Sequence, residues 1–148
     1  MTDEYLIEIG KLTVKYQFLE FHIKWLMEYF NKKSEKKSEM VTSEMKFWQL
    51  LKFLDTLNKS ENTDLKKQKQ LNLLITEAKK LSDLRNELIH SLWLTDIISG
   101  KVQREQISKK KGKERINVSL QDLKQNNDEI EKVVIKFVNL HVQFLTSK

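Results

Sequence analysis

The sequence predicts an all-α protein, a bundle of four to five helices with a short basic hairpin or loop before the last helix. The chain of 148 residues has no Pro and only three Gly, whereas sheet proteins need these residues at their tight turns. Apolar residues recur at helical spacing over long stretches, and a hydrophobic fraction of 39% can form one core at this length. We therefore expect a single helical domain spanning residues 1–148.

The first helix is predicted from about Asp3 to Asn31, and it carries two apolar stripes. A helix in a monomeric bundle needs only one such stripe. The second stripe therefore indicates either a helix buried centrally in its own bundle or a face that packs against a second copy, and we favour the second copy. The expected core stripe is Ile9, Leu12, Tyr16, Leu19, Ile23, Leu26 and Phe30, and the second stripe is Val14, Phe18, Phe21, Trp25 and Tyr29.

Two further helices are expected after a polar, lysine-rich connection at Asn31–Glu39. The second helix is predicted over about Ser43–Asn58. The third begins near Asp64, where Thr63 or Asp64 offers an N-cap, and continues to about Ile98. Gly100 follows the end of this helix, as is common at helix C-termini.

The segment from Lys101 to Val118 is expected to form a loose basic hairpin or an extended loop around Gly112. The last helix begins at Ser119, because Ser119 and Asp122 have the spacing of a capping box. Its core side is predicted to be Leu123, Ile130, Val133, Val134, Phe137, Leu140, His141 and Phe144.

Composition excludes several classes of function. The chain has no Cys, which excludes disulfide scaffolds, thiol nucleophiles and cysteine-ligated zinc. The three histidines are scattered at His22, His90 and His141, so we expect no metal site and no cofactor. The acidic N-terminus resembles no signal peptide, and no apolar run is long enough to span a membrane. These features predict a soluble, cytoplasmic protein.

Positive charge is concentrated in one segment. The formal net charge is +6, and the segment Lys101–Arg115 holds seven basic residues against two acidic ones. A local basic patch of this kind is typical of contacts with the phosphates of a nucleic acid, although a lysine-rich solvated loop remains equally compatible with the sequence. The candidate RNA contacts in this segment are Lys109, Lys110, Lys111, Lys113 and Arg115.

The third helix carries the residues best suited to catalysis. At 100° per residue, Asn86, His90 and Trp93 fall within about 60° of one another, opposite the leucines that face the core, and Arg85 flanks them. Arg is used for only three of the 27 basic residues, so its choice here favours bidentate contact with a phosphate. A His can transfer protons near neutral pH, and an Asn can orient it. An incidental His on a surface helix is the plainer interpretation.

The stretch Arg85-Asn86-Glu87-Leu88-Ile89-His90, followed by Ser-Leu-Trp, resembles the HEPN superfamily. The motif of that family is an Arg, usually followed by a polar residue such as Asn, and then a His several residues later. Arg85, Asn86 and His90 match it in type and spacing, and the match is specific over six to nine residues. The resemblance implies a helical homodimer whose motif helices form a composite cleft. It also implies metal-independent endoribonuclease activity, as in toxin–antitoxin, abortive-infection and other antiphage systems.

Transferred to this chain, the resemblance implies attack of the RNA 2′-hydroxyl on the adjacent phosphate. His90 would act as the base or the acid, Arg85 would stabilise the charge on the phosphate, and Asn86 would position them. Trp93 would stack on a base or seal the dimer. The alternatives are an inactive helical module that binds a protein partner, such as an antitoxin, and a plain RNA-binding protein.

Overall fold

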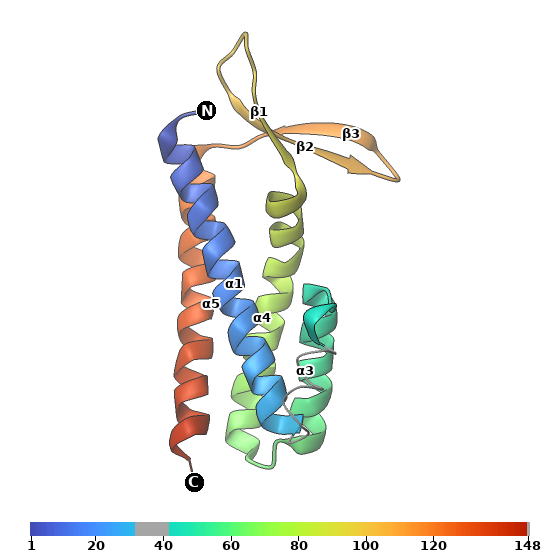
Figure 1. The fold of residues 1–148 in the computed structure, drawn as a ribbon, viewed down its shortest axis with the longest axis vertical. Helices are drawn as coiled ribbons and strands as arrows, with labels where there is room; N and C mark the ends of the chain where they lie inside the picture. The colour runs from blue at the N-terminus through green and yellow to red at the C-terminus, as the bar shows by residue number, and fades with distance from the viewer. Residues whose placement is uncertain (32–41, 148) are drawn as a thin grey trace.

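The computed structural model describes residues 1–31 and 42–147, which form four helices and one three-stranded sheet. The sheet covers one end of the helices (Figure 1). Most of the connection predicted at Asn31–Glu39 lies outside the described residues. The elements are α1 (Asp3–Asn31), α3 (Phe47–Glu61), α4 (Leu65–His90), β1 (Leu92–Thr95), β2 (Val102–Ser108), β3 (Gly112–Asn117) and α5 (Leu120–Thr146).

The helical bundle is confirmed, but the chain is not purely helical. The predicted continuation of the third helix to Ile98 is wrong, because α4 ends at His90 and the chain then forms β1. This strand pairs antiparallel with β2, from Leu92 opposite Glu105 to Thr95 opposite Val102. The paired residues are only 7 to 13 positions apart in sequence. The strand was missed because a short apolar run such as Leu92–Thr95 does not distinguish a strand from the continuation of a helix.

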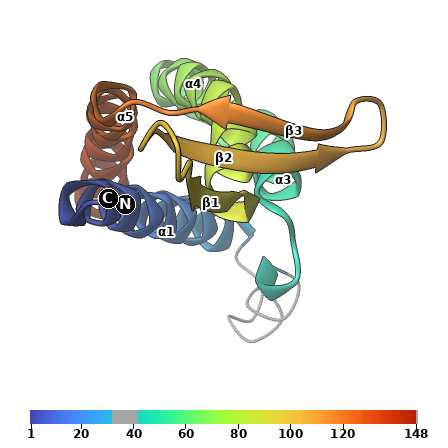
Figure 2. The ribbon, with the colours of Figure 1, turned by 90° about the horizontal axis from the view of Figure 1, so that it is seen from above.

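The basic segment forms a hairpin, the first of its two predicted alternatives. Strands β2 and β3 pair antiparallel, with Ser108 opposite Gly112. Gly112, the first residue of β3, has φ of +69°, a left-handed conformation that favours glycine directly after the three-residue loop. The hairpin projects away from the helices (Figure 2).

The loop between β1 and β2 is fixed by its own hydrogen bonds. The Asp96 carboxylate accepts bonds from the backbone N–H groups of Ile98 at 2.9 Å and Ser99 at 2.8 Å, which lower the pKa of that carboxyl. Ile97 and Ile98 are 100% and 99% exposed. Two isoleucines therefore stand entirely in solvent on an ordered loop.

Helix boundaries differ modestly from those predicted. Helix α3 begins at Phe47 and not near Ser43 as predicted. At this start, the Lys46 backbone N–H donates to the Gln49 side chain at 2.8 Å. The predicted start of the last helix is confirmed. The Ser119 side chain accepts from the Asp122 N–H at 3.0 Å, and the Asp122 carboxylate accepts from the Ser119 N–H at 3.1 Å.

Helix α3 is short, and this determines how open the bundle is. It has 15 residues, against 29, 26 and 27 for α1, α4 and α5. It accompanies only the end of the bundle far from the sheet, while α1 and α4 continue past it toward the sheet (Figure 1). Near the sheet, α1 and α4 therefore have no α3 beside them.

The two predicted stripes of α1 have different environments. The core stripe is confirmed, with Tyr16, Leu19 and Ile23 at most 1% exposed. In the second stripe, Phe18 and Phe21 are 55% and 57% exposed. The interpretation of α1 as a helix buried centrally in its own bundle is therefore wrong.

Helices α1 and α5 run side by side in the same direction (Figure 1). Polar contacts between them join residues 112 to 119 positions apart in sequence, all along the pair. When two helices run parallel, contacting residues keep a nearly constant separation in sequence along the whole pair, as they do here. The N-terminal and C-terminal helices are thus neighbours throughout their length.

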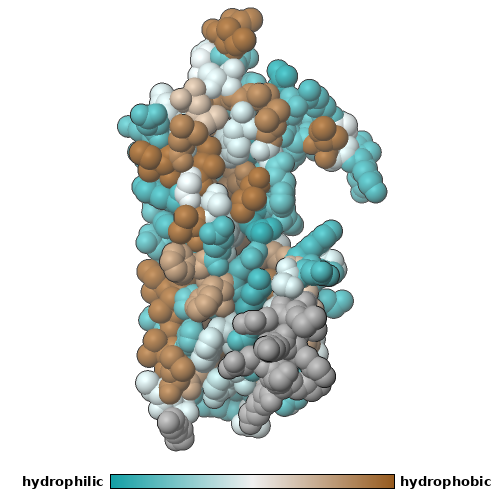
Figure 3. Space-filling model, in the orientation of Figure 1, coloured by the Kyte–Doolittle hydropathy of each residue, from teal (hydrophilic) through white to brown (hydrophobic). Residues whose placement is uncertain are grey.

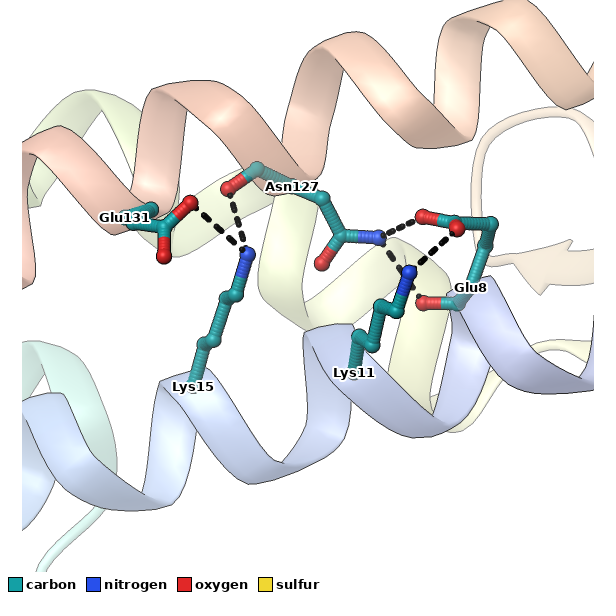
Figure 4. A network of polar contacts seen from close by, with 5 residues as sticks. All are labelled: Glu8, Lys11, Lys15, Asn127 and Glu131. Atoms are coloured by element: carbon teal, nitrogen blue, oxygen red, sulfur yellow. Dashed lines mark hydrogen bonds and ion pairs between the residues drawn. The ribbon is translucent and has the colours of Figure 1, made fainter.

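A polar cluster fixes this register near the sheet (Figure 4). The Asn127 side-chain amide donates to the backbone oxygen of Glu8 at 3.0 Å and to its carboxylate at 2.7 Å. The Lys11 ammonium also donates to that carboxylate at 2.8 Å, and this bond is the main reason why the pKa of Glu8 is lowered. Because Asn127 and Glu8 are buried, a slip of one helix along the other would leave these groups unpaired.

We expect Asn127→Ala to lower the free energy of unfolding by about 1–3 kcal/mol, because it removes two buried hydrogen bonds and leaves the Glu8 groups without this donor. Urea denaturation followed by circular dichroism measures the change. Gln125→Ala, on the exposed side of the same helix, is the control and should change it by less than about 0.5 kcal/mol. Equal effects of the two variants would contradict a structural role for Asn127.

Candidate functional site

Arg85 is the most constrained of the predicted site residues. Its guanidinium donates to the Glu20 carboxylate of α1 at 2.8 Å and to the Asn86 side-chain oxygen at 3.1 Å. It also lies over the ring of Phe47, the first residue of α3, at 5.6 Å from the ring centre. Arg85 thus crosses from α4 to α1 at the point where α3 begins.

The guanidinium still has hydrogen-bonding capacity. It has five N–H donors, and the two contacts above use one on each terminal nitrogen. The Nε atom is buried without a hydrogen-bond partner. The remaining donor on each terminal nitrogen can still bind an anion, because the side chain is 20% exposed.

Asn86 and His90 are exposed one turn apart on α4, as the helical spacing predicted. The leucines Leu81 and Leu88 of the same helix are buried, so the two polar residues are directed away from the core. His90 has no hydrogen bond or ion pair with any residue that the structure describes. Its imidazole is therefore free to contact a ligand from solvent.

Trp93 does not lie on the helix with Asn86 and His90, contrary to the helical spacing used to group them. It is in β1, and its indole N–H donates to the backbone oxygen of Leu88 at 3.0 Å. This bond satisfies one of the carbonyl groups that a helix leaves unpaired at its C-terminus. Trp93 is partly buried against the core, where it joins the sheet to α4.

The cations of the basic hairpin fall into two groups. Lys113 and Arg115 both bind the carboxylate of Glu105 on β2, at 3.0 and 2.8 Å, and the bond from Arg115 is the largest cause of the lowered pKa of Glu105. Lys109, Lys110 and Lys111 at the loop are exposed and form no ion pair within the described part of the chain. The loop lysines are thus the cations available to an anionic ligand.

From the sequence, Glu20 was expected to reach the cleft only if the first helix lines a dimer interface, whereas the structure places it against Arg85 within one chain. Its position on the first helix gave no indication of the contact, because α1 and α4 are far apart in sequence. A second ion pair was also missed. The Arg104 guanidinium of β2 donates to the Glu87 carboxylate of α4 at 2.9 Å, so the sheet is attached to α4 one residue beyond Asn86.

His22 and His141 form a pair of their own between α1 and α5. Their Nδ1 atoms are 2.8 Å apart, a distance at which one imidazole donates and the other accepts. The Trp25 ring stacks on His141 with ring centres 3.5 Å apart. Burial lowers the pKa of both histidines, and the nearby His141 lowers the pKa of His22 further. Both histidines are partly buried, at the edge of the core.

The structure offers no obvious site for a metal ion in its described ranges, 1–31 and 42–147. No three His, Asp or Glu side chains of these ranges come close enough together to hold one. None of the helices in these ranges is both long enough and apolar enough to cross a membrane.

Comparison of the chain with known protein families, characterised proteins and solved structures finds no match. The resemblance to HEPN proteins therefore rests on the motif residues alone.

We expect Glu20→Ala to lower the free energy of unfolding by about 1–3 kcal/mol, because it leaves the largely buried Arg85 guanidinium without its charged partner. Denaturant unfolding measures the effect. Asp83→Ala on the exposed side of α4 should change it by less than about 0.5 kcal/mol. A loss that is no larger for Glu20→Ala than for Asp83→Ala would show that the Glu20–Arg85 pair does not stabilise the fold.

We also expect the stability to decrease as the pH falls from about 7 to 5. The unfolded chain binds protons at His22 and His141 near pH 6.5, whereas the folded chain, with the lower pKa values, binds them only at lower pH. Stability therefore rises with pH across this window. In the double variant His22→Gln/His141→Gln, unfolding measured at fixed chain concentration should show a shallower pH dependence. An unchanged slope would contradict the role of this pair.

Proposed function

We propose that this protein is a metal-independent endoribonuclease in which Arg85, Asn86 and His90 act on a phosphodiester of RNA. The observation that carries the proposal is the position of the three residues. Arg85 is held beside Asn86 with donors to spare, and His90 is exposed one turn further along α4. This combination of a fixed cation and an available imidazole is what cleavage next to a 2′-hydroxyl requires.

In the proposed reaction, His90 removes the proton from the 2′-hydroxyl as its oxygen attacks the adjacent phosphorus. The bond from phosphorus to the 5′ oxygen breaks, and that oxygen receives a proton as it leaves. Arg85 donates to the phosphate oxygens as their negative charge increases. The products are a 2′,3′-cyclic phosphate and a 5′-hydroxyl end. DNA has no 2′-hydroxyl and should not be cleaved.

The loop lysines Lys109, Lys110 and Lys111 support RNA binding. They are exposed on a hairpin that is anchored to α4 by the Arg104–Glu87 pair. Contacts between lysines and phosphates release bound counterions, so RNA binding should weaken steeply with salt. Trp93 has its indole N–H engaged with Leu88, which favours a structural role for this residue over stacking on a base.

A composite site formed by two copies stays part of the proposal. One His90 would then act as the base, and the His90 of the second copy would protonate the leaving 5′ oxygen. This arrangement requires the exposed faces of two α4 helices to meet. Such an enzyme would act on cytoplasmic RNA, as the toxin of a toxin–antitoxin pair or as a component of antiphage defence.

The second candidate function is an inactive helical module that binds a protein partner, such as an antitoxin, or RNA. One observation favours it. Arg85 is engaged by Glu20 and packed on Phe47, which is also what a purely structural arginine would do. Cleavage of RNA distinguishes the two functions.

We expect the protein to cleave labelled RNA in the presence of EDTA, and we expect His90→Ala and Arg85→Ala each to slow cleavage about 100-fold or more. The rates are compared at equal folding by circular dichroism and at equal oligomeric state. Asp83→Ala is the matched control on the same helix and should retain the full rate. A single 2′-deoxy nucleotide at the cleaved position should block cleavage there.

Two results would contradict the proposal. If cleavage survives in both His90→Ala and Arg85→Ala, it comes from another site or from a contaminant. If the wild-type protein leaves every RNA intact, the inactive module becomes the better interpretation. A salt-sensitive shift of RNA on a gel would then separate binding of RNA from binding of a protein partner.

A further inference from the structure

The loop between β1 and β2 holds two isoleucines out of the molecule in a fixed conformation. Ile97 and Ile98 are fully exposed. The Asp96 backbone N–H donates to the Lys101 oxygen at 2.9 Å, and the Gly100 N–H donates to the Asp96 oxygen at 2.8 Å. Together with the two bonds to the Asp96 carboxylate, these contacts fix the whole turn. Apolar surface that is exposed on a fixed support often marks a binding site.

This loop is also the outermost point of the molecule at the sheet end (Figure 1). In the same orientation, the space-filling view shows hydrophobic side chains at the tip, with nothing beside them (Figure 3). A protein partner would need a groove shaped to receive such a projection. The apolar layer of a membrane is fluid and accepts apolar side chains of any shape.

The outer face of the sheet lies at the same end as this loop. Trp93 and Arg104 both bond to α4, so their side of the sheet faces the helices. Neighbouring residues of a strand point to opposite faces. Ile107, three positions after Arg104, therefore faces outward, and so do its partner Lys113 and the next residue but one, Arg115. Ile107 is 81% exposed, so this outer face combines apolar and positively charged side chains.

The hairpin as a whole is strongly positive. Residues 102–117 hold six basic residues against two acidic ones, Glu105 and Glu114. The Glu105 carboxylate is bound by Lys113 and Arg115, and the three lysines of the turn, residues 109–111, are exposed. An excess of positive charge therefore remains on the hairpin, and it is complementary to an anionic surface.

The other acidic residues near the sheet do not cancel this charge. Glu87 is paired with Arg104, and the Asp96 carboxylate accepts the two backbone bonds of its own loop. The remaining ones, Asp3, Glu4 and Asp122, are in the first turns of α1 and α5. The hairpin extends away from the side on which both of these helices begin (Figure 2). The negative and positive groups of this end thus lie on different sides.

A hollow of about 480 Å³ lies at the foot of the loop. Its lining includes Ser99 and Lys101 of the loop, Tyr5 of α1 and Asn117 of β3. Lys101 is exposed and forms no ion pair within residues 1–31 and 42–147. The Asn117 side-chain oxygen accepts a bond from Gln103 at 2.9 Å, which leaves the amide N–H groups of Asn117 to donate. An ammonium and an amide at one hollow are suitable donors for a phosphate.

We propose that the sheet end of this protein binds the surface of a membrane that contains anionic phospholipids. Ile97 and Ile98 enter the boundary between headgroups and acyl chains, about 5–10 Å deep. Lys101 binds a lipid phosphate at the hollow, and the cations of the hairpin approach neighbouring headgroups. Stable attachment at a membrane surface requires two signals, such as an apolar insertion and a basic patch. This end supplies both, and such a contact needs no membrane-spanning segment.

This membrane contact does not depend on the proposed cleavage of RNA. The turn lysines of the hairpin can bind the phosphates of either ligand, but an aliphatic side chain offers RNA neither a charge nor a hydrogen bond. The isoleucines therefore distinguish the two ligands. An inactive protein would bind the membrane equally well, and measurement of vesicle binding requires no enzymatic activity.

Flotation with lipid vesicles tests the proposal. The full chain should float with vesicles of phosphatidylcholine in which about a third of the lipid is phosphatidylglycerol, and its affinity for pure phosphatidylcholine should be at least about tenfold lower. The double variant Ile97→Asn/Ile98→Asn should lower the affinity for the anionic vesicles about 100-fold or more. Leu73→Asn, at a residue of α4 that is 66% exposed, is the matched control and should retain the wild-type affinity. Circular dichroism verifies that each variant is folded.

The basic patch is tested in the same way. The triple variant Lys109→Gln/Lys110→Gln/Lys111→Gln should lower the affinity for anionic vesicles about tenfold or more, because each lysine near such a surface contributes about fivefold. The control is Lys66→Gln/Lys69→Gln/Lys80→Gln, which removes three exposed lysines of α4. It should have a much smaller effect, because these lysines lie far from the sheet end.

A fluorescent label reports whether the loop enters the lipid. The chain has no Cys, so an environment-sensitive dye can be attached at Ile98→Cys alone. Its emission should increase with anionic vesicles and be quenched by spin-labelled lipids, whereas the same dye at Leu73→Cys should not respond. A wild-type protein that does not float with anionic vesicles at about 0.1 M salt would overturn the proposal, and a protein partner would better explain the isoleucines. Binding that needs the lysines but not the isoleucines would also overturn it.

Discussion

The short length of α3 is the constraint on which the rest of the architecture depends. With 15 residues against 26 or more in the other helices, it completes the bundle only at the end far from the sheet. At its first residue, Phe47, the bundle opens, and the Glu20–Arg85 ion pair joins α1 directly to α4. An apolar fourth helix would otherwise cover this position. The polar residues of α4 are exposed because no helix lies beside them.

The sheet closes the end that α3 leaves open. The strand β1 continues directly from α4, and the Trp93 indole ties the strand to the last turn of that helix. On β2, Arg104 binds Glu87, so both contacts hold the sheet to the last turn of α4, which also carries His90. The imidazole is therefore exposed on a rigid support. A site with this support needs little reorganisation to receive a ligand.

Much of this arrangement could be predicted from local sequence. The core stripe of α1 and the capping box at Ser119 depend only on neighbouring residues, and both are confirmed. The spacing of Asn86 and His90 was likewise sufficient to predict that both face solvent. The Glu20–Arg85 pair joins residues 65 positions apart, so the pattern of one helix cannot indicate it. The strand at Leu92–Thr95 pairs with residues only 7 to 13 positions away, but its short apolar run is equally compatible with a continued helix. A row of exposed aliphatic residues on α5 could have been found, because Ile135, Val138, Val142 and Leu145 follow a regular three–four spacing.

The pairing of α1 with α5 has a consequence for how the chain reaches this structure. Helix α1 is synthesised before the other described helices, but its main neighbour is α5, more than 100 residues later. Contacts between such distant segments form slowly, because a long loop must close first. Until α5 has been synthesised, the core stripe of α1 lacks its main neighbour. A nascent chain halted before Ser119 should therefore bind general chaperones, and its release should coincide with the synthesis of α5.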